Sequence, residues 1–121
     1  MAFGERLRAL RREKKINQRT LARVAGIDVT YLSKIETGAM DPPAAATVQR
    51  LAAALDQDPT ELLLLAKKIP PDVRDILTDR PEVVQFLRTT KRQQWGPAEW
   101  RALERKAERR QLRLFDAMDD G

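Results

Sequence analysis

The stretch QRTLARVAGIDVTYLSKIE, residues 18–36, decides the fold of this chain. Its apolar residues recur three or four positions apart, as they do on one face of a helix, and Gly26 interrupts the pattern near the middle. Glycine tolerates the positive φ with which many helices end, and Asp28 is a good N-cap for a following helix. The stretch therefore predicts two short helices joined by a tight turn, the second ending by Gly38.

Two short helices joined in this way form a helix-turn-helix, whose geometry makes seven demands on the sequence. The first helix needs two apolar residues and a very small residue where the helices approach closely. The turn needs a glycine and then an apolar anchor, and the second helix needs two apolar residues three apart. All seven are present, at Leu21, Ala22, Ala25, Gly26, Ile27, Leu32 and Ile35. Because a chance match is expected in on the order of one chain in a hundred, the motif is specific.

Helical patterns continue on both sides of the motif, and no stretch shows the sustained alternation that predicts strands. The break Ile69-Pro70-Pro71 indicates a boundary between a domain of residues 1–68 and a segment of residues 69–121. The further helices expected are at about 3–15, 45–55, 72–77, 81–87 and 97–118, with a polar link at 91–95. One more helix is expected to open at Asp58-Pro59-Thr60-Glu61, with Asp58 as N-cap and Pro59 in its first turn.

The charge of the chain is uneven. It carries 23 Lys and Arg against 18 Asp and Glu, a net charge of +5. Residues 1–40 hold nine basic and four acidic residues, whereas residues 41–68 have a net charge of −1 and residues 69–121 of +1. A basic excess confined to the part that contains the helix-turn-helix indicates an anionic partner, with nucleic acid as the first candidate.

The composition excludes several classes of function. The chain has no Cys and no His, which removes disulfides, thiolate metal sites, the commonest general base and the commonest zinc ligand. Since it also lacks a Gly-rich phosphate loop, we expect no enzyme activity, no cofactor and no metal. No run approaches the roughly 18 apolar residues of a membrane span, and residues 1–4 lack a signal-peptide core. We therefore expect a cytoplasmic, nucleoid-associated protein with no membrane partner.

The wider sequence resembles the lambda-repressor/Cro (Xre-like) type of helix-turn-helix DNA-binding transcriptional regulators. The matching text is GERLRALR at 4–11, NQRTLA at 17–22, YLSKIETG at 31–38, Pro43, and the helix of Leu51 and Leu55. The resemblance covers residues 3–66, about half of the chain. It implies an all-α, five-helix DNA-binding domain, followed in this chain by a small helical C-terminal extension.

The resemblance also implies a structural ion pair and a set of phosphate contacts. Arg11 and Glu36 match a pair that links the first helix to the end of the recognition helix, the second helix of the motif. Gln18 matches a residue that contacts a DNA phosphate at a helix N-terminus. Tyr31 either contacts a phosphate or packs over the preceding helix. The residues expected at phosphates are Asn17, Gln18, Arg19, Tyr31 and Thr37.

The recognition helix offers four residues to the DNA major groove after its two core positions are set aside: Val29, Thr30, Ser33 and Lys34. Related domains often carry Gln at the first position of this helix, which binds adenine at two points. Val29 gives up that hydrogen-bonded contact and indicates contact with a thymine methyl group. Lys34 is expected to reach either guanine or a phosphate.

Residues 69–121 are too apolar for a disordered tail and carry candidate interface residues, namely Phe86, Leu87, Trp95, Trp100, Leu103, Leu114 and Phe115. Members of this family usually dimerise, which places two recognition helices about 34 Å apart. Three interpretations remain open: a homodimerisation module, a helical extension packed on the first domain, or a docking segment for another protein such as a toxin or a regulatory protease.

The sequence therefore favours a sequence-specific regulator of transcription that binds double-stranded DNA. The leading hypothesis is a repressor that binds an inverted-repeat operator as a homodimer, with residues 29–37 in the major groove. The alternative is an antitoxin of a toxin–antitoxin pair, whose main role is protein interaction and whose DNA binding is autoregulatory.

Overall fold

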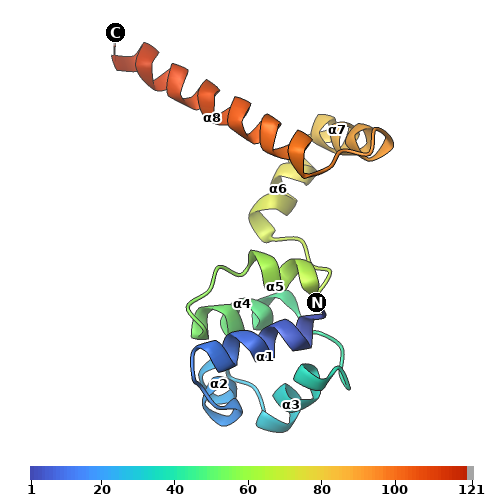
Figure 1. Ribbon diagram of the computed structural model, residues 1–121, viewed down its shortest axis with the longest axis vertical. Helices are drawn as coiled ribbons and strands as arrows, with labels where there is room; N and C mark the ends of the chain where they lie inside the picture. Colours follow the sequence, from blue (N-terminus) through green and yellow to red (C-terminus); the bar gives the residue numbers. More distant parts are fainter. Residues whose placement is uncertain (120–121) are drawn as a thin grey trace. The chain divides into compact units, whose positions relative to one another are not determined.

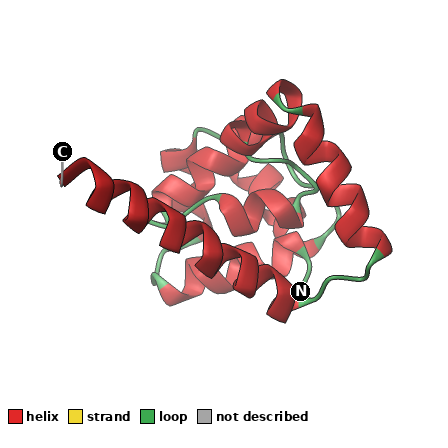
Figure 2. Ribbon diagram, turned by 90° about the horizontal axis from the view of Figure 1, so that it is seen from above, coloured by secondary structure: helices red, strands yellow, loops and turns green. Residues whose placement is uncertain are grey.

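The computed structural model describes residues 1–119, and for residues 112–119 it describes the backbone alone. Every regular element in this part of the chain is a helix, as Figure 2 shows, so the expected all-α fold class is confirmed. The helices are α1 (Phe3–Glu13), α2 (Gln18–Ala25), α3 (Val29–Thr37), α4 (Ala45–Ala54), α5 (Thr60–Leu65), α6 (Pro71–Asp79), α7 (Pro81–Arg92) and α8 (Pro97–Asp119). They form two compact units, residues 1–75 and the chain from residue 76 onward.

The first unit contains the five helices of a lambda-repressor-like domain around one apolar core. Within it, α1 packs on α3 and α5, α2 packs on α3 and α4, and α4 packs on α5 (Figure 1). The apolar residues buried there are Phe3, Leu7, Leu10, Leu21, Ala22, Ala25, Leu32, Ile35, Val48, Leu51, Ala52, Leu55, Leu62, Leu63 and Ala66. Their spacing of three or four along each helix explains why the local pattern predicted these elements.

Gly4 allows α1 to lie directly against the end of α3. A Cβ built on Gly4 would stand 2.7 Å from the carbonyl oxygen of Glu36 and closer still to that of Ile35. Only a residue without a side chain therefore fits at this crossing. The sequence pattern gave no signal of this, because the contact joins segments about thirty residues apart.

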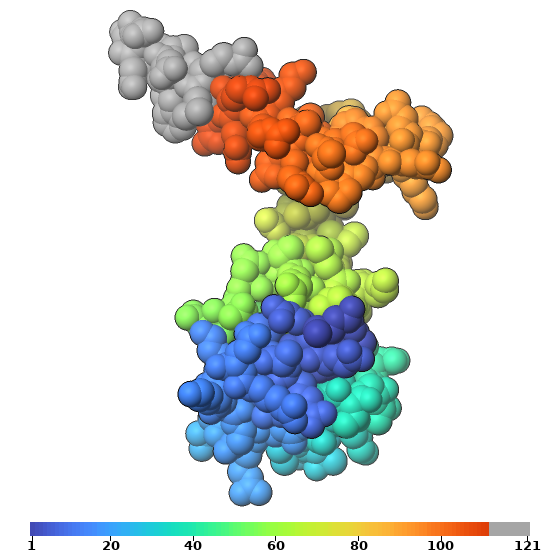
Figure 3. Space-filling model, viewed as in Figure 1, coloured from blue at the N-terminus to red at the C-terminus, as the bar shows by residue number. Residues whose placement is uncertain are grey.

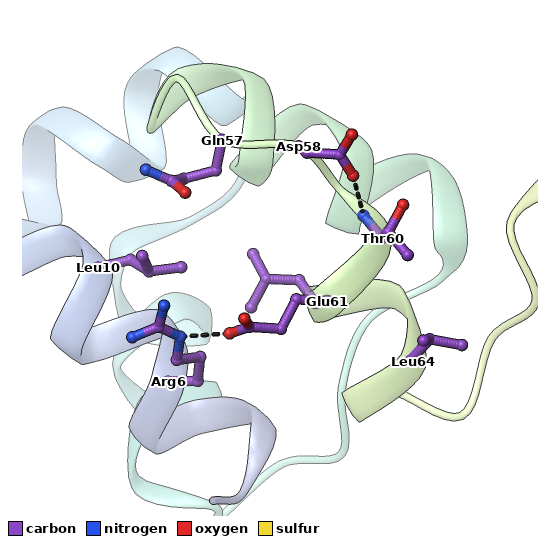
Figure 4. Close-up of a pocket in the computed structure, with 8 residues that line it drawn as sticks. Arg6, Leu10, Gln57, Asp58, Thr60, Glu61 and Leu64 are labelled. Atoms are coloured by element: carbon purple, nitrogen blue, oxygen red, sulfur yellow. Dashed lines mark hydrogen bonds and ion pairs between the residues drawn. The ribbon is translucent and has the colours of Figure 1, made fainter. Parts of the chain in front are cut away.

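An ion pair connects α1 to α5 on another side of the unit. Figure 4 shows Arg6 of α1 facing Glu61 of α5 across a surface hollow, and the two side chains are paired. At the start of α5, the Asp58 carboxylate accepts a hydrogen bond from the backbone N–H of Thr60 at 2.8 Å. Hydrogen bonds from the side chain and the backbone of Thr60 hold the pKa of Asp58 below its ordinary value.

The second unit is held together by an aromatic cluster, formed by Phe86, Trp95 and Trp100. The ring centroids lie 5.5 Å apart for Phe86 and Trp95, 6.4 Å for Phe86 and Trp100, and 5.0 Å for Trp95 and Trp100. The edge-to-face arrangement of all three pairs is the geometry that aromatic rings prefer. The cluster joins the middle of α7 and the connection after it to the beginning of α8.

Some helix ends differ from the sequence prediction. The helix expected over 81–87 extends to Arg92, so the polar link at 91–95 is wrong over its first two residues. Thr90 is buried, and its hydroxyl donates to the carbonyl of Leu87 at 2.7 Å, so the last turn of α7 is anchored in the unit. Conversely, the helix expected over about 3–15 is α1, and it ends earlier, at Glu13, because Lys15 has a left-handed φ of 55°.

Candidate nucleic-acid interface

The N-terminus of α2 presents unpaired backbone donors to the surface. The Asn17 side chain caps the helix by accepting from the backbone N–H of Thr20 at 2.8 Å. Within residues 1–119, no acceptor takes the backbone N–H of Gln18 or Arg19. Free N–H groups and the positive end of the helix dipole together favour an anion at this point.

A polar hollow of ≈ 600 Å³ lies at this helix end. Its lining residues are Arg8, Arg11, Asn17, Gln18, Arg19 and Val29. Three arginines and the start of both α2 and α3 therefore border one space. Arg8 was not among the residues expected from the sequence, because nothing in the local pattern of α1 says that its exposed side faces α2.

A buried hydrogen-bonded network connects α1, α2 and α3. Glu36 accepts from Arg11 at two points, Nε to Oε2 at 2.8 Å and Nη2 to Oε1 at 3.0 Å. The Arg11 side chain is 11% exposed and that of Glu36 is 1% exposed. Arg11 Nη1 also donates to the carbonyl of Ile16 at 3.0 Å, and Gln18 Nε2 donates to Glu36 Oε1 at 3.2 Å. Within the described residues, no buried side-chain polar atom of this group lacks a hydrogen-bond partner, so the network fixes Gln18 and α3 to the same point.

The turn between α2 and α3 has the geometry that the sequence predicts. Gly26 has φ 71° and ψ 35°, and the N–H of Ile27 reaches back to the carbonyl of Ala22 at 2.9 Å. Arg50 of α4 donates from Nε to the carbonyl of Ala25 at 3.0 Å, which satisfies one of the last acceptors of α2. This hydrogen bond was not expected from the sequence, since its donor lies on a helix outside the motif.

The helix α3 has one buried side and one outward side. Leu32, Ile35 and Glu36 are buried, while Asp28 caps the helix by accepting from the N–H of Thr30 at 2.7 Å. At 100° per residue, the outward residues fall within an arc of about 140°. These are Val29, Thr30, Ser33, Lys34 and Thr37, of which Thr30, Lys34 and Thr37 are exposed and the other two half-buried.

Of the residues expected at phosphates, Asn17 and Gln18 hydrogen-bond within the protein, and Tyr31 and Thr37 also have contacts within it. Tyr31 is half-buried and packs against the apolar core. The Thr37 hydroxyl donates to the carbonyl of Lys34 at 3.2 Å. Its oxygen can still accept, but this bond orients the side chain along its own helix.

The candidate interface residues of the C-terminal segment gather in the second unit. Phe86 is 40% exposed, Leu87 39% and Trp100 38%, whereas Trp95 and Leu103 are half-buried. Apolar side chains of this size and exposure at one aromatic cluster leave an apolar surface uncovered. The side chains of Leu114 and Phe115 lie outside the described residues.

Residues 1–111, whose side chains the structure describes, contain no group of three or more His, Cys, Asp or Glu side chains placed to hold a metal ion. None of the helices within residues 1–119 combines the length and the apolar character needed to cross a bilayer.

The fold and the site together define an all-helical protein with a helix-turn-helix, in which a free helix N-terminus and an outward helix face are held by one buried network. The family model described as "Helix-turn-helix domain" matches residues 4–68, more than half of the chain. The chain therefore belongs to the helix-turn-helix domain family.

Known proteins similar to this chain include two from Bacillus subtilis (strain 168). The HTH-type transcriptional repressor RghR is 44% identical over 54 residues, which are 45% of this chain and 40% of RghR. The HTH-type transcriptional regulator RghRB is 34% identical over 90 residues, 72% of this chain and 65% of RghRB. The match thus spans between 40% and 65% of these relatives. The restriction-modification controller protein C.AhdI from Aeromonas hydrophila has 42% sequence identity and a TM-score of 0.47, covering 50% of this chain and 89% of its own.

Proposed function

We propose that this chain is a transcriptional repressor that binds a specific double-stranded DNA sequence. In this proposal, residues 1–68 bind the DNA, α3 lies in the major groove, and the start of α2 holds a backbone phosphate. The base-reading residues are Val29, Thr30, Ser33 and Lys34. The similarity to RghR, a transcriptional repressor, supports repression as the direction of regulation.

The observation that carries this proposal is the buried network of Arg11, Glu36 and Gln18. Gln18 stands at the helix end with free N–H groups, and Glu36 stands on the back of the helix that carries the outward polar face. One ion pair therefore fixes the distance between a phosphate site and a base-reading face. Precise placement of these two contacts relative to each other is what a helix-turn-helix needs for its register on DNA.

We further propose that the protein binds as a homodimer through its second unit. The exposed side chains of Phe86, Leu87 and Trp100 support this, because an uncovered apolar surface favours association. A two-fold dimer would recognise an inverted repeat with half-sites about 34 Å apart, or a multiple of that distance.

The first experiment is a selection from random DNA with the full chain and with residues 1–68 alone, at one fixed salt concentration. We expect the full chain to recover an inverted repeat and the truncated chain to recover a half-site or to bind more weakly. Weak binding by both without sequence preference would contradict the proposal.

Oligomeric state is tested separately by sedimentation of the full chain and of the variant Trp100→Ala. We expect a dimer for the native chain and a shift toward monomer for the variant. A native chain that sediments as a monomer at the concentration used for DNA binding would refute the dimer. Co-purification of a different protein in place of a second copy of this chain would also refute it.

A further inference from the structure

The helix α8 carries a local excess of positive charge, although the net charge of the whole C-terminal segment is close to zero. Residues 100–111 hold five basic and two acidic side chains, a net charge of +3. The basic residues are Arg101, Arg105, Lys106, Arg109 and Arg110. All five are exposed, and none of them has an ion-pair partner within the described residues.

These charges are segregated on the helix. Arg101, Arg105 and Arg109 are four residues apart, so they follow one side of α8 with a rise of about 6 Å between neighbours. Lys106 and Arg110 extend this basic face around the helix. The apolar residues Trp100, Leu103 and Ala107 lie on the opposite side, as helical spacing places them. Figure 3 shows the described part of α8 at the surface.

The repeated arginines of this face repel one another, and Glu104 and Glu108, each three residues after one of these arginines, offset that repulsion only in part because the stretch keeps a net charge of +3. Like charges four residues apart repel each other, and helices that use charge only for solubility alternate the signs along each side. In α8, Glu104 and Glu108 are also four residues apart and follow a separate line between the apolar and the basic side. The pattern therefore favours a basic face that binds an extended anion.

We propose that the basic face of α8, defined by Arg101, Arg105, Lys106, Arg109 and Arg110, is a second DNA-binding surface that contacts backbone phosphates without reading sequence. This inference rests on the proposed function, because the helix-turn-helix of the same chain brings α8 to DNA. A row of guanidinium groups suits phosphate oxygens, which guanidinium binds at two points.

DNA fits this surface better than an anionic membrane does. A helix that lies in a bilayer surface inserts its large apolar side chains between lipids. In α8, however, Trp100 packs edge-to-face on Phe86 and Trp95. Trp100, although 38% exposed, is thus held by two rings of its own unit, whereas the basic side chains of α8 are exposed and free to bind an anion.

The test is the salt dependence of DNA binding by the full chain. Each phosphate contact contributes about 0.9 to the slope of log K against log salt concentration. The variant Arg101→Gln/Arg105→Gln/Arg109→Gln is expected to lower the slope by about 2.7 for each α8 that lies on the DNA. Between 50 and 200 mM salt, the native chain should then lose about fortyfold more affinity than the variant, on operator and unrelated DNA alike.

A matched control removes three other exposed arginines. The variant Arg74→Gln/Arg80→Gln/Arg88→Gln changes the net charge by the same amount outside α8 and should leave the slope close to that of the native chain. Glutamine keeps helix propensity, and circular dichroism and sedimentation verify that both variants retain their helices and their mass.

The outcomes distinguish the two proposals. Specific operator binding by the native chain, with equal slopes for the native chain and the α8 variant, overturns this inference and leaves the proposed function intact. No sequence-specific binding by the native chain overturns the proposed function itself. If the native chain binds phosphatidylserine vesicles more tightly than the α8 variant does, while both show the same slope on DNA, the DNA assignment is overturned in favour of a membrane.

Discussion

Removal of the Glu36 carboxylate tests the network on which the proposed interface depends. The substitution Glu36→Ala leaves the Arg11 guanidinium, whose side chain is 11% exposed, without its carboxylate partner. It also removes the acceptor of the Gln18 amide. Only the Arg11 bond to the carbonyl of Ile16 remains.

The expected loss of stability follows from this geometry. Truncating one partner of a buried ion pair costs about 3–5 kcal/mol, because the other charge stays buried and unpaired. Since Arg11 keeps one bond and a small exposed area, we expect the lower end, about 3 kcal/mol. In a unit of this size, each kcal/mol lowers Tm by roughly 4–8 °C, so the expected shift is roughly 12–24 °C.

The assay is thermal unfolding followed by circular dichroism, with DNA affinity measured at a temperature where the variant is still folded. The matched control is Glu61→Ala, which breaks the other ion pair of α1. The side chains of that pair, Arg6 and Glu61, are 29% and 57% exposed, so breaking it should lower the free energy of unfolding by at most about 1 kcal/mol. The double variant Arg11→Met/Glu36→Ala should lose less stability than the sum of the two single variants. An unchanged Tm and full DNA affinity in Glu36→Ala would refute the reasoning.

Three further predictions concern other points of the molecule. Gly4→Ala should lower stability by about 1–3 kcal/mol, because the added methyl collides with carbonyl oxygens of α3. The control is Gly96→Ala, whose methyl would meet only the Glu99 carboxylate, at an ordinary contact distance of 3.5 Å, and equal melting curves would contradict the close approach. Lys34→Ala should cost about 1–3 kcal/mol of DNA-binding free energy and relax specificity at one base, measured on a panel of operator variants; a uniform loss would make Lys34 a phosphate contact. The pKa of Asp58 is lowered on folding, so its contribution to stability is present above its ordinary pKa of 3.8 and is lost as the pH falls through the lowered value. Asp58→Asn should therefore be less stable than the native chain at pH 7 but not at pH 2. If the variant and the native chain differed in stability by the same amount at both pH values, the Asp58 carboxylate would have no such role.

Local sequence rules predicted the helices of the first unit well, because each depends on nearby residues. The cap at Asn17, the left-handed Gly26 and the cap at Asp28 all act within three or four residues of themselves. The apolar spacing in turn predicted which side of each helix is buried. Prediction failed at the end of α7, where burial of Thr90 extends a helix whose polar sequence gave no apolar signal.

The sequence by itself thus determined the elements, the turn between α2 and α3, and the side of α3 that faces outward, since these follow from backbone propensity and helical period. The tertiary structure decided which side chains meet. The Gln18 bond to Glu36, the Arg50 bond to the end of α2 and the approach of Gly4 to α3 join residues 18 to 32 positions apart. Helical period shows which face is buried but not which partner covers it, and that choice depends on how all five helices fill one core.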